Sequence, residues 1–216
     1  MSDRRELSVE AFVLAGGHSR RMGRDKALLE WEGSTLIERA LRSLHGVASR
    51  VRIVGDREDL ARFAPIVFDT FPGSGPLGGI HAALASSTHD WNVFLPVDLP
   101  LLPAGFLPWM LQRVALTEAV ATIPVAAGLM QPLCGVYHRA LESSLREVLA
   151  AGRFRTIEGI QAAANLVDWS EPRLDVFRVE SLAAAGNFRG IAATSSVQLW
   201  FENMNEPIDL FASGNV

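Results

Sequence analysis

The stretch VEAFVLAGGHSRRMGRDK, residues 9–26, begins with a short apolar run and ends in a loop rich in glycine and positive charge. The run Val9–Leu14, followed by Gly16 and Gly17, is typical of a buried strand that leads directly into a tight loop. Glycines let backbone N–H groups turn inward and approach a ligand closely. One acidic residue in this loop stands against four cations, Arg20, Arg21, Arg24 and Lys26. We therefore expect the loop to bind an anion such as phosphate rather than to form an ordinary surface turn.

Short β-rich runs alternate with helical patterns over the first half of the chain. The expected strands are Val9–Leu14, Val51–Val54, Pro65–Phe68 and Trp91–Val97. The expected helices are Leu36–Leu44, capped by Ser34 or Thr35, then Ile80–Ser86, and residues 103–115. This alternation predicts an α/β fold whose mostly parallel central sheet is covered by helices on both faces.

The second half of the chain is less regular. Further strands are expected at Ala119–Val125 and Pro132–Tyr137, and a helix at Arg139–Ala151. Residues 170–196 carry small residues without a clear period, and we interpret them as an excursion that is partly helical. A β-like run returns at Val197–Phe201, and a short helix is expected after Pro207.

Polar or flexible residues follow three of the expected strands at the point where each strand ends. Gly16 and Gly17 follow the first strand, while Asp69 and Asp98 follow later ones. Ligands of open parallel sheets bind outside the carboxyl ends of the strands. These residues therefore mark a candidate ligand site at one edge of the sheet.

The bulk composition excludes several classes of protein. The chain has 216 residues, 49% of them hydrophobic, which is enough for one well-cored domain. Its net charge of −4 provides no basic field for nucleic acid or an anionic membrane. The single cysteine, Cys134, excludes an intramolecular disulfide and is expected to be a small buried hydrophobe. No signal peptide or membrane-length apolar run is evident, so we expect a soluble, cytoplasmic protein.

Two familiar nucleotide-binding motifs do not fit. The first loop is not a Walker A motif, because its glycines are adjacent and Lys26 is followed by Ala27 instead of Ser or Thr. Residues 73–78 spell G-x-G-x-x-G with Asp98 twenty residues further on, which imitates a dinucleotide fingerprint. However, Gly73 lies four residues beyond its strand, and the loop follows a third strand instead of a first one. A dinucleotide site is therefore disfavoured.

Four segments in order resemble the molybdenum cofactor guanylyltransferases. They are residues 14–29 (LAGGHSRRMGRDKALL), residues 75–80 (GPLGGI), residues 97–100 (VDLP) and residues 203–207 (NMNEP). The resemblance runs from residue 8 to about 211. It implies a single-domain, three-layer α/β/α nucleotidyltransferase (Rossmann-like) fold over residues 1–216. Its nucleotide-binding half would span about 8–120 and its cofactor-substrate half about 121–211.

The resemblance also implies a reaction. The terminal phosphate of molybdenum-loaded molybdopterin would attack the α-phosphate of GTP, releasing pyrophosphate and forming the guanine dinucleotide cofactor. A phosphomonoester has its second pKa near ~6, so this nucleophile is largely ionised at neutral pH and should need no general base. The implied partners are GTP, the molybdopterin cofactor, client molybdoenzymes and an accessory GTP-binding protein, with no nucleic acid and no membrane.

Carried over position by position, the resemblance assigns the site. The catalytic residues would be Arg21, Lys26 and Asp98, with Asp98 holding Mg²⁺. The nucleotide would be bound by Leu14, Ala15, Gly16, Gly17, Lys26, Asp69, Gly75 and Asp98. The pterin side would include Gln131, Asn203 and Asn205. Lys26 is the only lysine among the 20 basic residues, and it falls within the strongest of these motifs.

Several alternatives stay open. Asp98 could instead cap a helix or turn before Pro100, and Asp69 could merely cap a turn. Core packing would explain Gln131 nearly as well, and Asn205 could close a turn. Where some family members place an asparagine after the second strand, this chain has Val54-Gly55-Asp56, and the excursion at 170–196 is longer than the resemblance requires. A CTP-dependent molybdopterin cytidylyltransferase, a related nucleotidyltransferase and a non-catalytic carrier of the cofactor are the competing functions.

Overall fold

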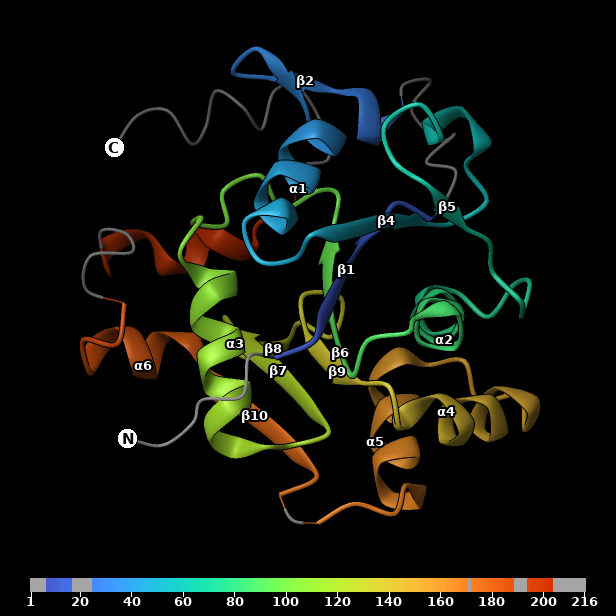
Figure 1. The fold of residues 1–216 in the computed structure, drawn as a ribbon. Coiled ribbons are helices and arrows are strands. Elements are labelled where there is room, and N and C mark those ends of the chain that lie inside the picture. Colours follow the sequence, from blue (N-terminus) through green and yellow to red (C-terminus); the bar gives the residue numbers. More distant parts are fainter. Residues whose placement is uncertain (1–6, 17–24, 171, 189–193, 204–216) are drawn as a thin grey trace.

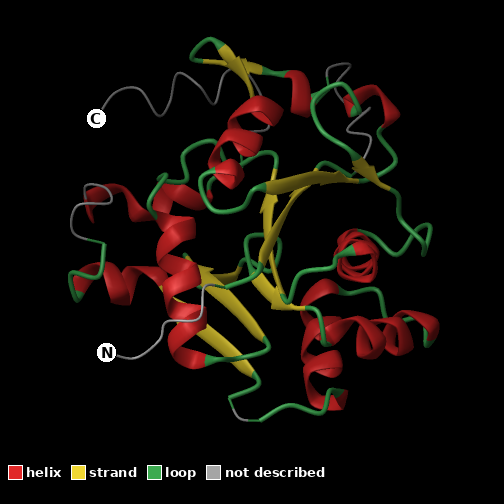
Figure 2. Cartoon of the chain, viewed as in Figure 1, coloured by secondary structure: helices red, strands yellow, loops and turns green. Residues whose placement is uncertain are grey.

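The computed structural model describes residues 7–16, 25–170, 172–188 and 194–203. Within them, the main sheet has eight strands in the order β10-β7-β9-β6-β1-β4-β5, with β8 paired to β7 (Figure 2). β1 pairs in parallel with β4 and β6, β4 with β5, and β10 with β7, whereas β8 and β9 pair antiparallel. The strands are β1 (Val9–Leu14), β4 (Arg50–Val54), β5 (Ile66–Val67), β6 (Trp91–Pro96), β7 (Ala121–Ala126), β8 (Leu129–Met130), β9 (Val136–His138) and β10 (Leu174–Arg178).

Helices cover both faces of this sheet and give the chain three layers (Figure 1). One apolar core contains side chains of α1 (Leu36–His45), α3 (Phe106–Thr117) and α6 (Val179–Ala184). The other contains side chains of α2 (Pro76–Ser86), α4 (Leu141–Ala150) and α5 (Thr156–Leu166). Successive residues of a strand point to opposite faces, so β1 supplies Val13 to the first core and Phe12 to the second. The predicted three-layer α/β/α fold with a mostly parallel sheet is confirmed.

The register of the central strands brings their carboxyl ends to one edge. Leu14, the last residue of β1, is paired with both Val54 of β4 and Pro96 of β6. Val54 is in turn paired with Val67 of β5. The loops that follow these four strands therefore leave the sheet side by side, which is where the sequence places its candidate ligand residues.

Helix α1 begins where the sequence predicted. A short hairpin of β2 (Glu30–Trp31) and β3 (Ser34–Thr35) leads into it. The Thr35 hydroxyl accepts a hydrogen bond from the backbone N–H of Glu38, and the Glu38 carboxylate accepts one from the backbone N–H of Thr35. This reciprocal capping box identifies Thr35, one of the two expected residues, as the cap.

Helix α2 begins earlier than predicted, at Pro76 instead of Ile80. Gly75 has φ 64° and ψ −154°, which turns the chain, and Pro76 fits the first helical position because that position needs no N–H donor. Every residue from Leu77 to Leu84 is buried. The run Gly-Pro-Leu-Gly-Gly thus resembles a loop in sequence, but most of it forms the first turn of a helix packed inside the protein.

The carboxy-terminal part contains the main departures from expectation. Helix α5 was not predicted, and the excursion at 170–196 contains both β10 and α6. β10 was missed because its hydrophobic pattern is inverted: the charged Asp175 is buried and the apolar Val176 is exposed. Asp175 is buried because it accepts two hydrogen bonds of 2.6 Å from Arg113 of α3. The strand expected at Pro132–Tyr137 shortens to β9, because residues 131–134 form a turn closed by the bond from Cys134 N to Gln131 O.

The expectation of a strand at Val197–Phe201 is wrong, because these residues lie in a 3-10 helix, η4 (Thr194–Phe201). Val197, Trp200 and Phe201 are all buried, a spacing of three and four residues that fits one helical face. Trp200 and Phe201 pack against Phe106 at ring-centroid distances of 5.7 and 5.6 Å. None of the described helices is long and apolar enough to cross a membrane.

Candidate active site

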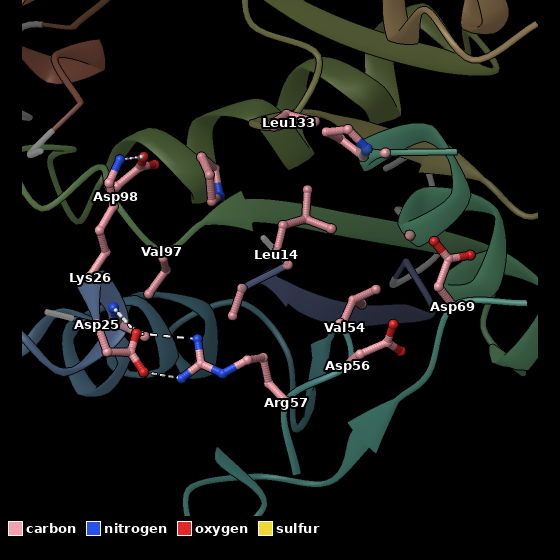
Figure 3. A pocket seen from close by; sticks show the side chains of 18 of the residues that line it. Leu14, Asp25, Lys26, Val54, Asp56, Arg57, Asp69, Val97, Asp98 and Leu133 are labelled. Atoms are coloured by element: carbon pink, nitrogen blue, oxygen red, sulfur yellow. Dashed lines mark hydrogen bonds and ion pairs between the residues drawn. The ribbon is translucent and has the colours of Figure 1, made fainter. Parts of the chain in front are cut away.

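A cavity of about 900 Å³ opens at the carboxyl ends of β1, β4, β5 and β6 (Figure 3). Its described walls come from segments far apart in the sequence. They are residues 14–16, residues 25–27, residues 54–57, Asp69, Gly73, Gly75, Pro76, Gly79, residues 96–98 and Leu133. The structure therefore brings the first glycine loop, the second glycine loop and the Asp98 segment to one cavity, as the sequence predicted.

The first loop leaves β1 held by backbone hydrogen bonds on both sides. The N–H of Ala15 donates to Val54 O at 3.1 Å, and Leu14 O accepts from the N–H of Val97 at 3.2 Å. Gly55 packs against the loop so closely that a Cβ there would lie 2.9 Å from the Cα of Gly16. On the open side, a Cβ on Gly16 would meet nothing within 4 Å. Leu14, Ala15 and Gly16 thus form one wall of the cavity, whereas Gly17 and Arg21 lie outside the described residues.

Lys26 and Asp98 lie next to each other at one side of the cavity (Figure 3). Lys26 begins the 3-10 turn η2 (Lys26–Leu28), and its Nζ lies 3.9 Å from Oδ2 of Asp98. Their side chains are 27% and 21% exposed, so both can meet a ligand. Burial raises the pKa of the Asp98 carboxyl, and the positive charge of Lys26 partly offsets that rise. Asp98 does not cap α3, which begins at Phe106 after Gly105, so the helix-cap alternative is wrong.

Asp69 lies at the start of the second loop. Its Oδ1 accepts a hydrogen bond of 2.8 Å from the backbone N–H of Phe71, so it caps a turn as well as lining the cavity. Burial raises the pKa of the Asp69 carboxyl most, and the negative charge of Asp56 adds to the rise. A Cβ on Gly78 would lie 1.9 Å from the Ser74 hydroxyl and 2.7 to 2.8 Å from the Asp69 carboxylate. Glycine at position 78 therefore makes room for the orientation of Asp69.

Comparison with known proteins agrees with this geometry. Residues 11–165 match the model of the MobA-like NTP transferase domain family. The chain belongs to this family. A molybdenum cofactor guanylyltransferase from Mannheimia succiniciproducens is 32% identical over 183 residues, which cover 82% of this chain and 96% of that protein.

Two crystal structures have similar folds. A protein from Aquifex aeolicus is 27% identical, with a TM-score of 0.67 over 93% of this chain and 94% of its own. Molybdopterin-guanine dinucleotide biosynthesis protein A from Archaeoglobus fulgidus is 23% identical, with a TM-score of 0.67 over 94% of this chain and 95% of its own. At that identity the second likeness concerns the fold alone.

Several cavity residues of this MobA-like domain, three of them charged, were not assigned to the site from the sequence. Asp25 and Arg57 form an ion pair, and Asp56 and Leu133 also line the cavity. From the sequence, Asp25 was expected only as a counter-charge to the cations of the first loop. A signal was present, because Asp25 precedes a short helical turn and its Oδ1 caps that turn through the N–H of Ala27 at 3.0 Å. For Arg57 no local signal places it at the cavity, since Asp25, its partner there, lies 32 residues away.

The departure at Val54 has a structural consequence. Val54 lines the cavity at the end of β4, and its side chain is almost fully buried. An apolar side chain there offers no hydrogen bond to a ligand, unlike an asparagine. The polar group nearest in sequence that lines the cavity is the exposed carboxylate of Asp56.

Of the residues expected on the pterin side, the structure describes Gln131 and Asn203, and neither lines this cavity. Gln131 begins the turn before β9, and its side-chain amide donates to Leu129 O at 3.5 Å. Asn203 is exposed after η4, and Asn205 lies outside the described residues. Leu133, two residues after Gln131, does reach the cavity. The assignment of Gln131, Asn203 and Asn205 therefore stays a prediction.

The described walls of the cavity carry more negative than positive charge. Four carboxylates, Asp25, Asp56, Asp69 and Asp98, stand against Lys26 and Arg57. A polyphosphate would meet repulsion from such walls unless further cations joined it. The loop sequence supplies three arginines at positions 20, 21 and 24, and the carboxylates offer the hard oxygen ligands that a divalent cation prefers.

Proposed function

We propose that this chain transfers GMP from GTP to the terminal phosphate of molybdenum-loaded molybdopterin, forming the guanine dinucleotide cofactor and pyrophosphate. The observation that carries the proposal is that Lys26 and Asp98 lie next to each other in a cavity that residues of two glycine-containing loops also line. The named activity of the Mannheimia relative supports the choice of acceptor and nucleotide.

The residues of the cavity suit a transfer that needs positioning and charge stabilisation. An oxygen of the acceptor phosphate attacks the α-phosphorus of GTP, and the bond from that phosphorus to the α–β bridging oxygen breaks as pyrophosphate leaves. Because the acceptor phosphate is already ionised at neutral pH, its oxygen requires no base. Lys26 is placed to neutralise charge on the triphosphate, and the backbone of Leu14–Gly16 is placed to hold the nucleotide.

The donor set of the cavity fits Mg²⁺. Among the described residues, no group of three or more His, Cys, Asp or Glu side chains is arranged to hold a metal ion. Mg²⁺ usually takes only one or two carboxylates and completes its shell with water and substrate phosphates, so Asp98 suffices as an anchor. Mg²⁺ bound there would neutralise developing charge on the phosphate oxygens as a Lewis acid.

The choice of GTP over CTP rests on the cavity walls as well as on the relative. Ionised carboxylates only accept hydrogen bonds. The Watson–Crick edge of guanine carries N–H donors on two neighbouring nitrogens, N1 and the amino N2, whereas that of cytosine carries one amino donor beside two acceptors. Asp69 and Asp56 therefore favour guanine. A cofactor carrier without activity is disfavoured, because such a protein would not need Lys26 and Asp98 to face each other.

The test is incubation of the purified full chain with molybdenum-loaded molybdopterin, Mg²⁺ and either GTP or CTP. We expect stoichiometric release of pyrophosphate and a guanine dinucleotide with GTP, and neither product with CTP. A cytosine product would replace the guanine assignment by the cytidylyltransferase alternative. Absence of product with both nucleotides, while the cofactor still binds, would favour the carrier.

A further inference from the structure

Arg57 occupies an unusual place at the edge of the cavity. Its side chain is only 8% exposed, although it lines an open site. The guanidinium lies between two carboxylates, Asp25 from the first loop and Asp59 from η3 (Glu58–Leu60). Figure 3 shows the contact with Asp25. Its hydrogen bonds to Asp59 first, and then to Asp25, raise its pKa above the usual arginine range.

These contacts use most of the hydrogen-bonding capacity of the guanidinium. Nε and Nη2 donate to the two oxygens of Asp59 at 2.8 and 2.7 Å. Nη1 donates to Oδ1 of Asp25 at 3.2 Å, and Nη2 donates to its Oδ2. Four of the five N–H donors of an arginine are therefore directed at carboxylates. Two adjacent negative charges also leave Arg57 little net attraction for a phosphate.

The same Asp25 carboxylate determines where Lys26 begins. Its Oδ1, which accepts from Arg57, also accepts the backbone N–H of Ala27 at 3.0 Å. That bond caps the turn η2, whose first residue is Lys26. A continuous set of contacts thus runs from Arg57, at the end of β4, through Asp25 to the lysine that faces Asp98.

We infer that Arg57 is a positioning residue: paired with Asp25, it fixes the turn that aims Lys26 at the phosphates of the nucleotide. The inference rests on the proposed function for the identity of the nucleotide. Arg57 would not touch the substrate itself. Its fork geometry is required, because only a planar guanidinium can hold both oxygens of Asp25 through Nη1 and Nη2, whereas an ammonium is a point charge.

A double-variant cycle separates this role from direct binding and from a purely structural role. Equilibrium binding of GTP with Mg²⁺ is measured by calorimetry for the wild type, Arg57→Gln, Lys26→Ala and the double variant. If Arg57 acts through Lys26, we expect Arg57→Gln to weaken binding about tenfold when Lys26 is present, the scale of losing one charge-assisted contact. In the Lys26→Ala background the same change should cost less than about twofold. Equal losses in both backgrounds, or none in either, would overturn the inference.

Three further variants control for folding and for the choice of carboxylate. Arg57→Lys keeps the charge, and we expect a Tm near that of the wild type with GTP binding as weak as in Arg57→Gln; full recovery of binding would refute the need for a fork. Asp25→Asn should match Arg57→Gln. Asp59→Asn, which touches the same guanidinium but not η2, should stay within about twofold of the wild type. A loss at Asp59 equal to that at Asp25 would contradict transmission through Asp25.

The cycle is repeated with inorganic pyrophosphate and Mg²⁺ as the probe, since Lys26 is expected to act on phosphates. If the wild type binds these probes but transfers nothing to molybdopterin, the proposed function fails while the cycle still tests Arg57. Failure of the wild type to bind either probe would overturn both. If the enzyme is active but the losses from Arg57→Gln and Lys26→Ala add independently, the inference about Arg57 is overturned and the proposed function stands.

Discussion

Lys26 Nζ lies 3.9 Å from Asp98 Oδ2, a separation longer than a direct hydrogen bond. The two groups are held by different strands, because Lys26 follows β1 through the first loop and Asp98 follows β6. Both side chains are partly exposed to the same cavity. In a loosely paired lysine and aspartate, the lysine can take a phosphate and the aspartate a cation as its new partner, so neither charge is left unpaired. The pair therefore keeps the charges of the site balanced in the free enzyme and available to the charged groups of the substrate.

Replacing Asp98 by asparagine tests the anchor of the metal. Asp98→Asn removes a carboxylate without changing its size, and we expect turnover to fall at least about 100-fold, comparable with the loss of other preorganised charge contacts in active sites. Binding of GTP in the absence of a metal ion should be largely retained. Steady-state kinetics and calorimetry measure the two effects. Asp168→Asn, at an exposed position after α5, is the matched control, and near-normal turnover of Asp98→Asn would refute the assignment.

Replacing Lys26 by arginine tests why one lysine persists in a chain that otherwise uses arginine for its side-chain cations. An ammonium is a compact charge that fits a crowded triphosphate, whereas guanidinium is a broad planar fork. We expect Lys26→Arg to retain less than about one tenth of wild-type kcat/KM, with an unchanged Tm. A variant near the full rate would mean that charge alone matters at this position.

Gly78→Ala tests the space that the Asp69 carboxylate needs. The added Cβ would meet both the Ser74 hydroxyl and Asp69, and overpacking of this kind typically costs about 1–3 kcal/mol of stability. We expect KM for GTP to rise about tenfold, since Asp69 is displaced from the cavity wall.

The double variant Ser74→Ala/Gly78→Ala assigns the cause of that change. Removing the hydroxyl relieves the shortest contact but not the two contacts with Asp69, so we expect only partial recovery of KM. Complete recovery would show that Ser74 alone is displaced, and a wild-type KM for Gly78→Ala would contradict the role of Asp69.

Local patterns predicted the parts of the fold that local forces determine. β1 matches its expected bounds, and α1 does so within one residue, because its apolar spacing and its Thr35–Glu38 capping box lie within a few neighbouring residues. β10 did not follow its pattern, because a partner on α3 overrides it. Asp175 is buried against Arg113, 62 residues away, and no local rule anticipates a buried carboxylate in a strand.

The site shows the same division. Gly16, Asp69 and Asp98 could be placed at strand ends from the sequence alone, because carboxyl ends of parallel strands meet at one edge. Arg57 could not, since its role depends on a contact between loops that follow two different strands. One sequence shows which residues could form an ion pair but not which of them meet.

The thiol of Cys134 offers a check on the core beside the cavity. Cys134 is 1% exposed, and burial raises the pKa of the thiol to about 12. The thiolate is the reactive form, so at pH 8 we expect an aromatic disulfide reagent to modify the native protein very slowly. In denaturant one thiol per chain should react rapidly, because the sequence contains a single cysteine. Rapid stoichiometric labelling of the native protein would contradict the packing of this turn.

His138 of β9 predicts how stability depends on pH. Its ring packs between Trp91 and Trp169, at centroid distances of 4.8 and 4.5 Å, and Nδ1 accepts the backbone N–H of Ala140 at 3.2 Å. Burial, with a smaller contribution from Arg139, lowers the pKa of His138 in the folded state. Between that lowered pKa and the unfolded value near ~6.5, the unfolded chain binds more protons than the folded one.

The free energy of unfolding should therefore be highest above about pH 6.5 and fall as the pH drops through that window. In His138→Asn, whose side-chain oxygen can still accept from Ala140, we expect a shallower fall between about pH 7 and pH 5. Urea unfolding at several pH values measures both slopes. His45→Asn, which loses an exposed imidazole at the end of α1, should follow the slope of the wild type. If His138→Asn keeps the wild-type slope, another group carries the pH dependence, and neutral His138 does not stabilise the fold.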